Sequence, residues 1–172
     1  MPSHKFFAEM SPALALEILE FTFANDKKHY RAVLEAVAQA RHVRSIFLER
    51  QPRVERARML ITQLSRPSLD LMADNLIRNW LLTQHSAMLV DFLDALGIAH
   101  TKGVVESLPD TMNEAPLRAA VASLLAKYPE ESVALYLRAF TEMNQTRWPH
   151  LETVLQDEPR LKLRGATPAV TA

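Results

Sequence analysis

The stretch at residues 67–97 constrains the fold most strongly, because its apolar side chains keep a helical period that changes phase once. In the first half, side chains three and four residues apart share one face: Leu69, Met72, Ala73, Leu76 and Trp80. In an unbroken helix, the second set would lie on the opposite side from Trp80: Leu89, Phe92, Leu93 and Leu96. A break near residues 83–86 removes this conflict. The stretch therefore predicts two helices that fold back as an antiparallel hairpin.

The rest of the chain continues this helical pattern, and glycine is scarce, with three residues in all. Helices are expected at residues 12–24, from 27 to a break near 40, around 43–47, at 53–65, at 114–128, from 129 and at 149–155. The sequence therefore predicts an all-α protein, a single-domain bundle of about seven to nine helices packed as antiparallel hairpins. The helical domain is expected at residues 1–160, with a flexible C-terminal tail at 161–172.

For three helices, the apolar side chains predict which residues are buried. The helix at 12–24 is apolar over more than half of its circumference, so we expect it to be buried in the domain or under a partner. The short helix around 43–47 should be anchored by Val43, Ile46 and Phe47. The core side of the helix at 53–65 is expected to comprise Val54, Ala57, Leu60, Ile61 and Leu64.

Several classes of site are excluded or disfavoured by residue content. The absence of cysteine rules out disulfides and thiolate metal sites, and the isolated glycines rule out a phosphate-binding loop or dinucleotide fingerprint. The six histidines are dispersed without an HExxH arrangement, and no GxSxG motif occurs. We therefore assign no catalytic residue, metal or cofactor, and the sequence favours a protein that is not an enzyme.

The expected location is cytoplasmic. The N-terminal residues lack the apolar core of a signal peptide, and no apolar run reaches the roughly 20 residues that span a bilayer. The absence of cysteine fits this compartment. We therefore expect no membrane contact.

Charge is distributed unevenly along a chain whose net charge is zero. Residues 26–66 hold ten Lys/Arg and four Asp/Glu, a net charge of +6, whereas residues 67–160 hold seven and thirteen, a net charge of −6. Arg41 and Arg44 continue an apolar stripe, which indicates either a break near Ala40 that releases them to solvent or a groove for an anionic partner. The candidate patch for such a partner comprises Arg41, Arg44, Arg50, Arg53, Arg56 and Arg58.

The segment 98–113 has no helical period and is longer than most connections in compact domains. Val104, Val105, Leu108 and Met112 suggest that it packs down, and a turn is expected at His100, Lys102 and Gly103. Together with a histidine of the central stretch, this loop gives a second candidate site, comprising His85, His100 and Lys102. For His85, a hydrogen-bonded structural role is the simpler interpretation.

The residues AKYPEESVALYL, at 126–137, resemble the boundary between the two helices of a tetratricopeptide-like repeat. No second copy follows at a fixed period, so this resemblance implies a helix-to-helix junction and no repeat function.

The leading hypothesis is a protein-protein interaction or scaffold module that binds a protein partner, with a symmetric homodimer as one form. The first alternative is a nucleic-acid-binding or regulatory protein that uses the patch at 41–58, which is less favoured because the rest of the chain is acidic. The second alternative is an enzyme or small-ligand carrier with its site near the His100 loop.

Overall fold

The computed structural model describes residues 2–144 and 146–165. Within these residues the chain forms ten α-helices and two 3-10 helices, and the only β-type pairing is an isolated bridge between Thr101 and Val104. The all-α class is confirmed. The chain divides into two compact units: an N-terminal unit, Met1–Trp80 with Arg164–Ala172, and a C-terminal unit, Leu81–Leu163. The single domain expected at 1–160 stays a prediction.

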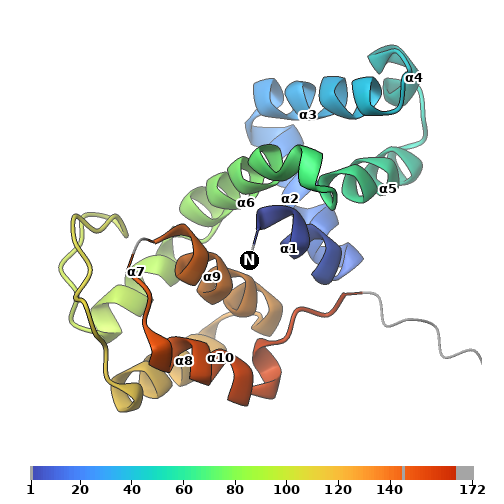
Figure 1. Ribbon diagram of the computed structural model, residues 1–172. Helices are drawn as coiled ribbons and strands as arrows, with labels where there is room; N and C mark the ends of the chain where they lie inside the picture. The colour runs from blue at the N-terminus through green and yellow to red at the C-terminus, as the bar shows by residue number, and fades with distance from the viewer. Residues whose placement is uncertain (1, 145, 166–172) are drawn as a thin grey trace, which may run out of the picture. The chain divides into compact units, whose positions relative to one another are not determined.

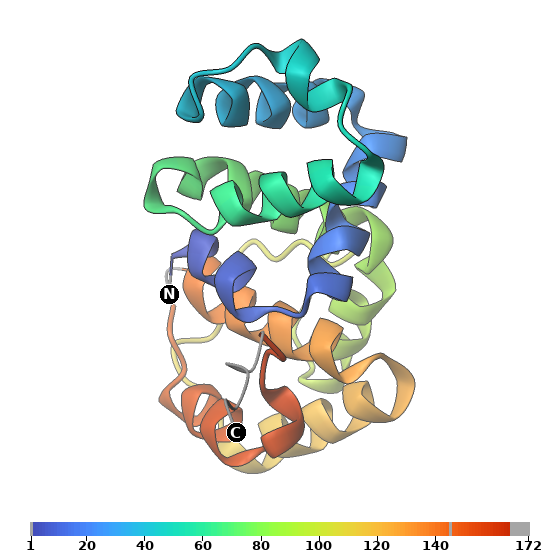
Figure 2. The same cartoon turned by 90° about the vertical axis from the view of Figure 1, so that its right-hand side faces the viewer.

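The N-terminal unit consists of helices around α5 (Figures 1 and 2). Its elements are α1 (Ser3–Glu9), α2 (Pro12–Asn25), α3 (Lys27–Ala40), α4 (Ser45–Glu49), α5 (Arg53–Leu64), η1 (Pro67–Leu69) and most of α6 (Asp70–Gln84). Helix α5 packs against α1, α2 and α3, while α4 packs against α3 where the chain turns back towards α5. This arrangement brings the basic segment of the sequence into one region of the unit.

Two capping side chains set the starts of helices in this unit. The Ser11 hydroxyl accepts a hydrogen bond from the Leu14 backbone N–H at 3.2 Å, and Pro12 occupies the first turn of α2. The Asp26 carboxylate accepts from the His29 backbone N–H at 3.1 Å and begins α3. Both starts were expected from the sequence, whereas α1 was not. This short helix carries the buried residues Phe6 and Phe7.

The central stretch forms α6 and α7 (Ser86–Ala95), separated by His85, as the phase change predicted. The expected buried faces are largely confirmed, with Leu69, Ala73, Leu76, Trp80, Leu89, Phe92 and Leu93 buried. The boundary between the two units falls within α6, after Trp80. The antiparallel pairing of α6 with α7 therefore stays a prediction.

The C-terminal unit is organised by α8 and α9. Its helices are the end of α6, α7, α8 (Glu114–Lys127), α9 (Glu130–Met143), α10 (Pro149–Asp157) and η2 (Pro159–Leu161). Helix α8 packs against α7, α9 and α10, and the junction between α8 and α9 lies where the repeat resemblance implied a helix boundary. An aromatic cluster joins Phe92, Tyr136, Phe140 and Trp148, with ring centroids 5.4–6.1 Å apart.

The expected flexible tail begins with a residue that is buried. Leu161 is fully buried, and its backbone carbonyl accepts a hydrogen bond from Arg138 Nη2 at 3.1 Å. Gly165 lies against α1, where an added Cβ would come within 2.6 Å of the Glu9 carbonyl oxygen. Residues 166–172 of the expected tail lie outside the described residues.

The structure contradicts the prediction that Ile46, Phe47 and Val54 are buried anchors of their helices. Ile46 and Phe47 are each 49% exposed and Val54 is 67% exposed, whereas Leu48 is fully buried. Helix α4 has only five residues, so it turns one side chain inward, and residues one and two positions away from Leu48 face elsewhere. Val54 lies in the first turn of α5, whose buried residues are Leu60, Gln63 and Leu64 near its other end.

No helix in the described part of the chain is long and apolar enough to cross a membrane.

Candidate functional site

Arg41 and Arg44 lie in the turn after α3 and are exposed. The helix ends at Ala40, and His42 then adopts a left-handed conformation with φ of 55°, which turns the chain away from the helix axis. Of the two interpretations of these arginines, the break that releases them to solvent is confirmed.

The other arginines of the candidate patch divide by their interactions. Arg53 Nη2 lies 2.9 Å from Glu20 Oε1, and Arg58 Nη1 lies 3.0 Å from Glu55 Oε1. Arg56 Nη1 donates to the Glu49 backbone carbonyl at 3.1 Å, which joins the end of α4 to α5. Among the described residues, Arg41, Arg44 and Arg50 have no ion pair, so the patch keeps an excess of positive charge.

A small hollow of about 150 Å³ lies between α2, α3 and α5, beside two arginines of this patch. Its lining comprises Leu16, Leu19, Glu20, Phe23, Tyr30, Arg53, Arg56 and Ala57. Phe23 and Tyr30 meet edge to face, with centroids 5.1 Å apart and an interplanar angle of 74°. Burial raises the pKa of Tyr30, although the positive charges of Arg56 and Arg53 oppose this change. The hollow therefore combines an apolar floor with a basic rim.

Large apolar side chains remain exposed around the arginines. Phe23 is 48% exposed at the hollow, and the exposed Ile46, Phe47 and Val54 alternate in sequence with arginines of the patch. The Arg56 bond to the Glu49 carbonyl joins the end of α4, which carries Ile46 and Phe47, to the first turns of α5. We call this set the basic-apolar surface; it comprises Phe23, Ile46, Phe47, Arg50, Arg53, Val54 and Arg56.

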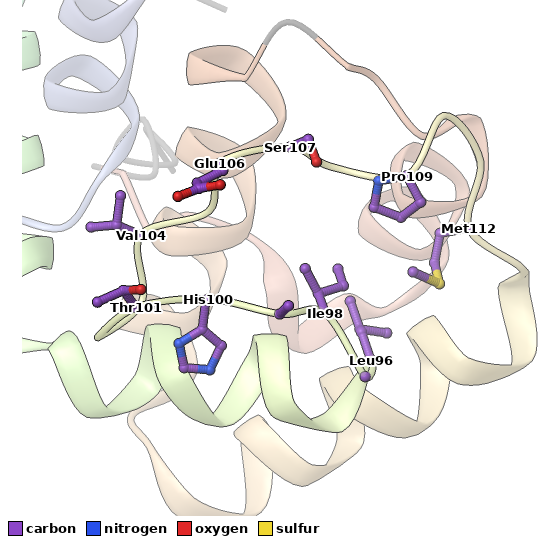
Figure 3. Close-up of a pocket in the computed structure, with 11 residues that line it drawn as sticks. Leu96, Ile98, His100, Thr101, Val104, Glu106, Ser107, Pro109 and Met112 are labelled. Carbon is purple, nitrogen blue, oxygen red and sulfur yellow. The ribbon is translucent and has the colours of Figure 1, made fainter.

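The loop between α7 and α8 encloses a larger pocket of about 470 Å³ within the C-terminal unit (Figure 3). Its lining comprises Leu96, Gly97, Ile98, Ala99, His100, Thr101, Val104, Glu106, Ser107, Pro109 and Met112. In Figure 3 the loop forms an open ring, and the side chains of Leu96, Ile98 and Met112 form its apolar side. We call this feature the loop pocket.

Specific hydrogen bonds hold the loop. The Thr101 and Val104 backbones exchange hydrogen bonds of 2.9 and 3.0 Å, and Lys102 and Gly103 between them have φ values of 52° and 85°. Two positive φ angles in succession define a type I′ turn, which confirms the turn expected here. At the other end of the loop, Trp148 Nε1 donates to the Pro109 carbonyl at 2.8 Å.

The structure brings one of the three predicted loop-site residues to the pocket. His100 lines it, while Lys102 is exposed at the turn and His85 lies at the junction of α6 and α7; neither of these two lines the pocket. Sequence reasoning missed the lining residues Glu106 and Ser107, because a segment without a helical or strand period gives no signal of which side chains line a pocket. The expected packing of Val104 is wrong, since this side chain is 61% exposed.

Metal-ligating side chains do not gather in the described residues, which contain no group of three or more His, Cys, Asp or Glu that could hold an ion. Asp26 and His29, three residues apart in the sequence, form a pair in which Asp26 Oδ2 lies 2.6 Å from His29 Nδ1. The His29 backbone N–H, followed by its ring, lowers the pKa of Asp26. The Asp26 carboxylate also accepts from Asn79 Nδ2 at 3.3 Å, so the structure gives this group a capping role.

A scan against protein-family models found no match, and searches of curated proteins and of solved structures found no significant match. Any function must therefore be argued from the two surfaces themselves.

Proposed function

We propose that the N-terminal unit is a protein-binding module that docks an acidic, amphipathic segment of a partner protein on the basic-apolar surface. The observation that carries this proposal is the half-exposed ring of Phe23 beside Arg53 and Arg56 at one hollow, with further exposed apolar side chains on α4 and α5. Aromatic residues and arginine are the side chains that most often dominate the energy of protein interfaces, whereas a face that only meets water does not need them.

The size of the hollow supports a protein partner rather than a free small molecule. At about 150 Å³ it is smaller than the roughly 300 to 1,000 Å³ of typical ligand pockets. It suits one apolar side chain of a partner, placed on Phe23 and Leu16. An anchor of this kind, surrounded by charged groups at the rim, is the usual form of an interface hot spot.

The exposed ion pair of Arg53 with Glu20 indicates which group of the partner would bind beside the hollow. The two side chains are 66% and 45% exposed, so their attraction contributes less than about 1 kcal/mol. A carboxylate of the partner can replace Glu20 at Arg53 with little loss. The preferred partner segment therefore carries Asp or Glu beside an apolar residue, as in an acidic amphipathic helix laid into a groove.

The aliphatic part of the surface favours a protein over a nucleic acid as the partner, since Ile46 and Val54 have no counterpart on a phosphate backbone. A second copy of the chain is one source of acidic segments, because residues 67–160 carry the net charge of −6. A cytoplasmic location, expected from the cysteine-free sequence, forms part of the proposal.

The test is a fluorescence titration of the full chain with a labelled acidic peptide of about 15 residues that carries leucines at helical spacing. Phe23→Ala, and Arg53→Gln combined with Arg56→Gln, should each weaken binding by about thirtyfold, as loss of a hot spot does. Arg58→Gln is the matched control, because Arg58 lies on the same helix outside the hollow and should leave the affinity unchanged.

Two further titrations decide between partners. A lysine version of the peptide should not bind, and a single-stranded oligonucleotide of equal charge should bind more weakly than the acidic peptide. Tighter binding of the oligonucleotide would replace the protein partner with a nucleic acid, and no binding of either would overturn the proposal. Light scattering on the wild type and on Phe23→Ala then shows whether a second copy is the occupant, since a self-associated form should revert to a monomer in the variant.

A further inference from the structure

The loop pocket is an open hollow whose walls are fixed by hydrogen bonds. Three contacts fix its ring: the hydrogen-bonded turn at Thr101 and Val104, the bond from Trp148 to the Pro109 carbonyl, and the pair of His100 Nε2 with Asp94 Oδ1 at 3.0 Å. These contacts join the ring to α7 and to the start of α10. The pocket therefore exists before any ligand arrives, which lowers the entropic cost of binding.

The hydrogen bonds of His100 define its protonation in this structure. The Gly103 backbone N–H donates to His100 Nδ1 at 3.1 Å, so Nδ1 acts as an acceptor and carries no proton. The proton then lies on Nε2, which donates to Asp94. Both ring nitrogens are engaged inside the loop, and His100 has no N–H left to offer a ligand in the pocket.

The remaining polar groups of the pocket are acceptors and hydroxyls. Glu106 lines the pocket and has no ion pair with another residue of the described chain, while Thr101 and Ser107 add hydroxyl groups. No lysine or arginine is among the lining residues, and Lys102 is turned away at the tip. In Figure 3 Glu106 lies across the ring from Ile98 and Leu96, and its exposed side chain is the one acidic group among the lining residues.

We propose that the loop pocket binds an alkylammonium group, with the cation at Glu106 and the aliphatic portion against Leu96, Ile98 and Met112. The volume of about 470 Å³ lies within the usual range for small-molecule sites. A carboxylate ligand is disfavoured because it would meet Glu106 without any basic group to compensate. This inference is independent of the proposed protein-binding function, since its residues belong to the other compact unit.

The alkylammonium group has two sources, a free alkylamine or a lysine side chain, and the experiment separates them. Full-length protein is titrated with n-hexylamine, with Nα-acetyl-lysine amide, with n-hexanol and with hexanoate, and binding is followed by the chemical shifts of backbone amides. Saturable binding of at least one ammonium probe is expected, with shifts confined to residues of the loop pocket. The tighter of the two ammonium probes identifies the source.

Two variants test whether the ammonium group binds at the Glu106 carboxylate. Glu106→Gln should weaken ammonium binding at least tenfold and leave binding of hexanol unchanged. Asp110→Asn is the matched control, because Asp110 is an exposed acid of the same loop outside the pocket lining and should not alter either affinity. The proposal is overturned if neither ammonium probe saturates at about 10 mM, a very weak limit for a specific site. It is also overturned if hexanoate or hexanol binds as tightly as hexylamine, or if Glu106→Gln has no effect.

Discussion

The basic-apolar surface and the loop pocket differ in what supports them and in what they offer to a ligand. The first is built on the faces of α2, α4 and α5, with exposed arginines and a hollow of about 150 Å³. The second is enclosed by a non-helical loop around about 470 Å³, with a carboxylate and no arginine or lysine in its lining. The ligands that we propose for them differ accordingly: a large acidic partner on the helices and a small cation in the loop.

The two sites also differ in how strongly their shapes depend on the conformation of the local backbone. Side chains on a helix keep their direction when a neighbour is truncated, so single substitutions on the basic-apolar surface should change affinity without changing the fold. The shape of the loop pocket depends on a few hydrogen bonds and on two residues with positive φ. Substitutions that release this backbone should therefore change stability and binding together.

The largest expected effect is the difference in the free energy of unfolding between alanine substitutions at two phenylalanines of the N-terminal unit. Phe6 of α1 is fully buried, so Phe6→Ala should lower the free energy of unfolding by about 3 to 5 kcal/mol. Phe23→Ala removes a half-exposed ring and should cost about 1 kcal/mol or less, while it weakens binding of the acidic peptide. Urea denaturation and the peptide titration measure both quantities. An equally large stability loss for Phe23→Ala would make that ring a core residue and weaken the case for a binding surface.

A smaller effect is expected at the anchor of the loop. Trp148→Phe keeps most of the buried ring but removes the N–H donor to the Pro109 carbonyl, and it should cost about 2 kcal/mol, partly because the carbonyl loses its partner. Hexylamine binding should weaken in the same variant. Pro109→Ala preserves the carbonyl and serves as the control in the denaturation assay. If both variants behave alike, the hydrogen bond does not hold the pocket open.

Two glycines with positive φ at this loop separate the effect of backbone strain from that of steric contact. Gly97 has φ of 67° and open space around an added Cβ, whereas Gly103 has φ of 85° and an added Cβ there would lie 3.3 Å from Leu89 Cβ. We expect Gly103→Ala to cost roughly 1.5 kcal/mol and Gly97→Ala roughly 1 kcal/mol. Gly103→Ala should also weaken hexylamine binding, because the contact of the new Cβ with Leu89 displaces the backbone N–H that donates to His100. Binding of hexylamine by Gly103→Ala as tight as by the wild type would show that this bond is not needed.

Much of the helical framework could be predicted because it depends on local signals. The cap at Ser11, the break at Ala40 and the phase change before Ser86 each follow from the conformational preference of a few neighbouring residues. The length of α1 explains why it was missed, since seven residues give too few turns for a periodic pattern. Local chemistry thus predicted where most helices begin and end.

The sites could be predicted only in part. The arginines of the basic-apolar surface were recognised from their density, yet Ile46, Phe47 and Val54 were assigned to the core. A helical pattern shows which residues share a face but not whether a neighbour covers that face. For the loop pocket, the sequence indicated His100 and the turn, whereas the place of Glu106 in the lining depends on how the ring closes through Trp148. That information lies in contacts between residues far apart in the chain.

The smallest expected effect concerns the helices that carry the loop pocket, and it depends on pH. Tyr128 Oη donates to Asp91 Oδ2 at 2.7 Å and Lys127 Nζ lies 3.1 Å from the same atom, which joins α8 to α7. The Tyr128 hydrogen bond, followed by that of Lys127, lowers the pKa of Asp91. Because the lowered pKa belongs to the folded state, the bond contributes stability above the ordinary aspartate pKa of about 3.9, and this contribution is lost as pH falls through the folded value. Tyr128→Phe should therefore cost about 1 kcal/mol at pH 7 and progressively less below about pH 4.

Urea denaturation of the wild type and Tyr128→Phe from pH 7 down to about pH 3 measures this difference, a range chosen to cross the carboxylate titration. Lys127→Gln is the comparison, and its cost should be smaller because the Lys127 side chain is 57% exposed and its attraction is screened by solvent. A stability difference between wild type and Tyr128→Phe that stays constant across this range would mean that the tyrosine acts through packing alone. In that case the carboxylate of Asp91 would not hold α7 to α8, and the support of the loop pocket would have to come from the apolar contacts of these two helices.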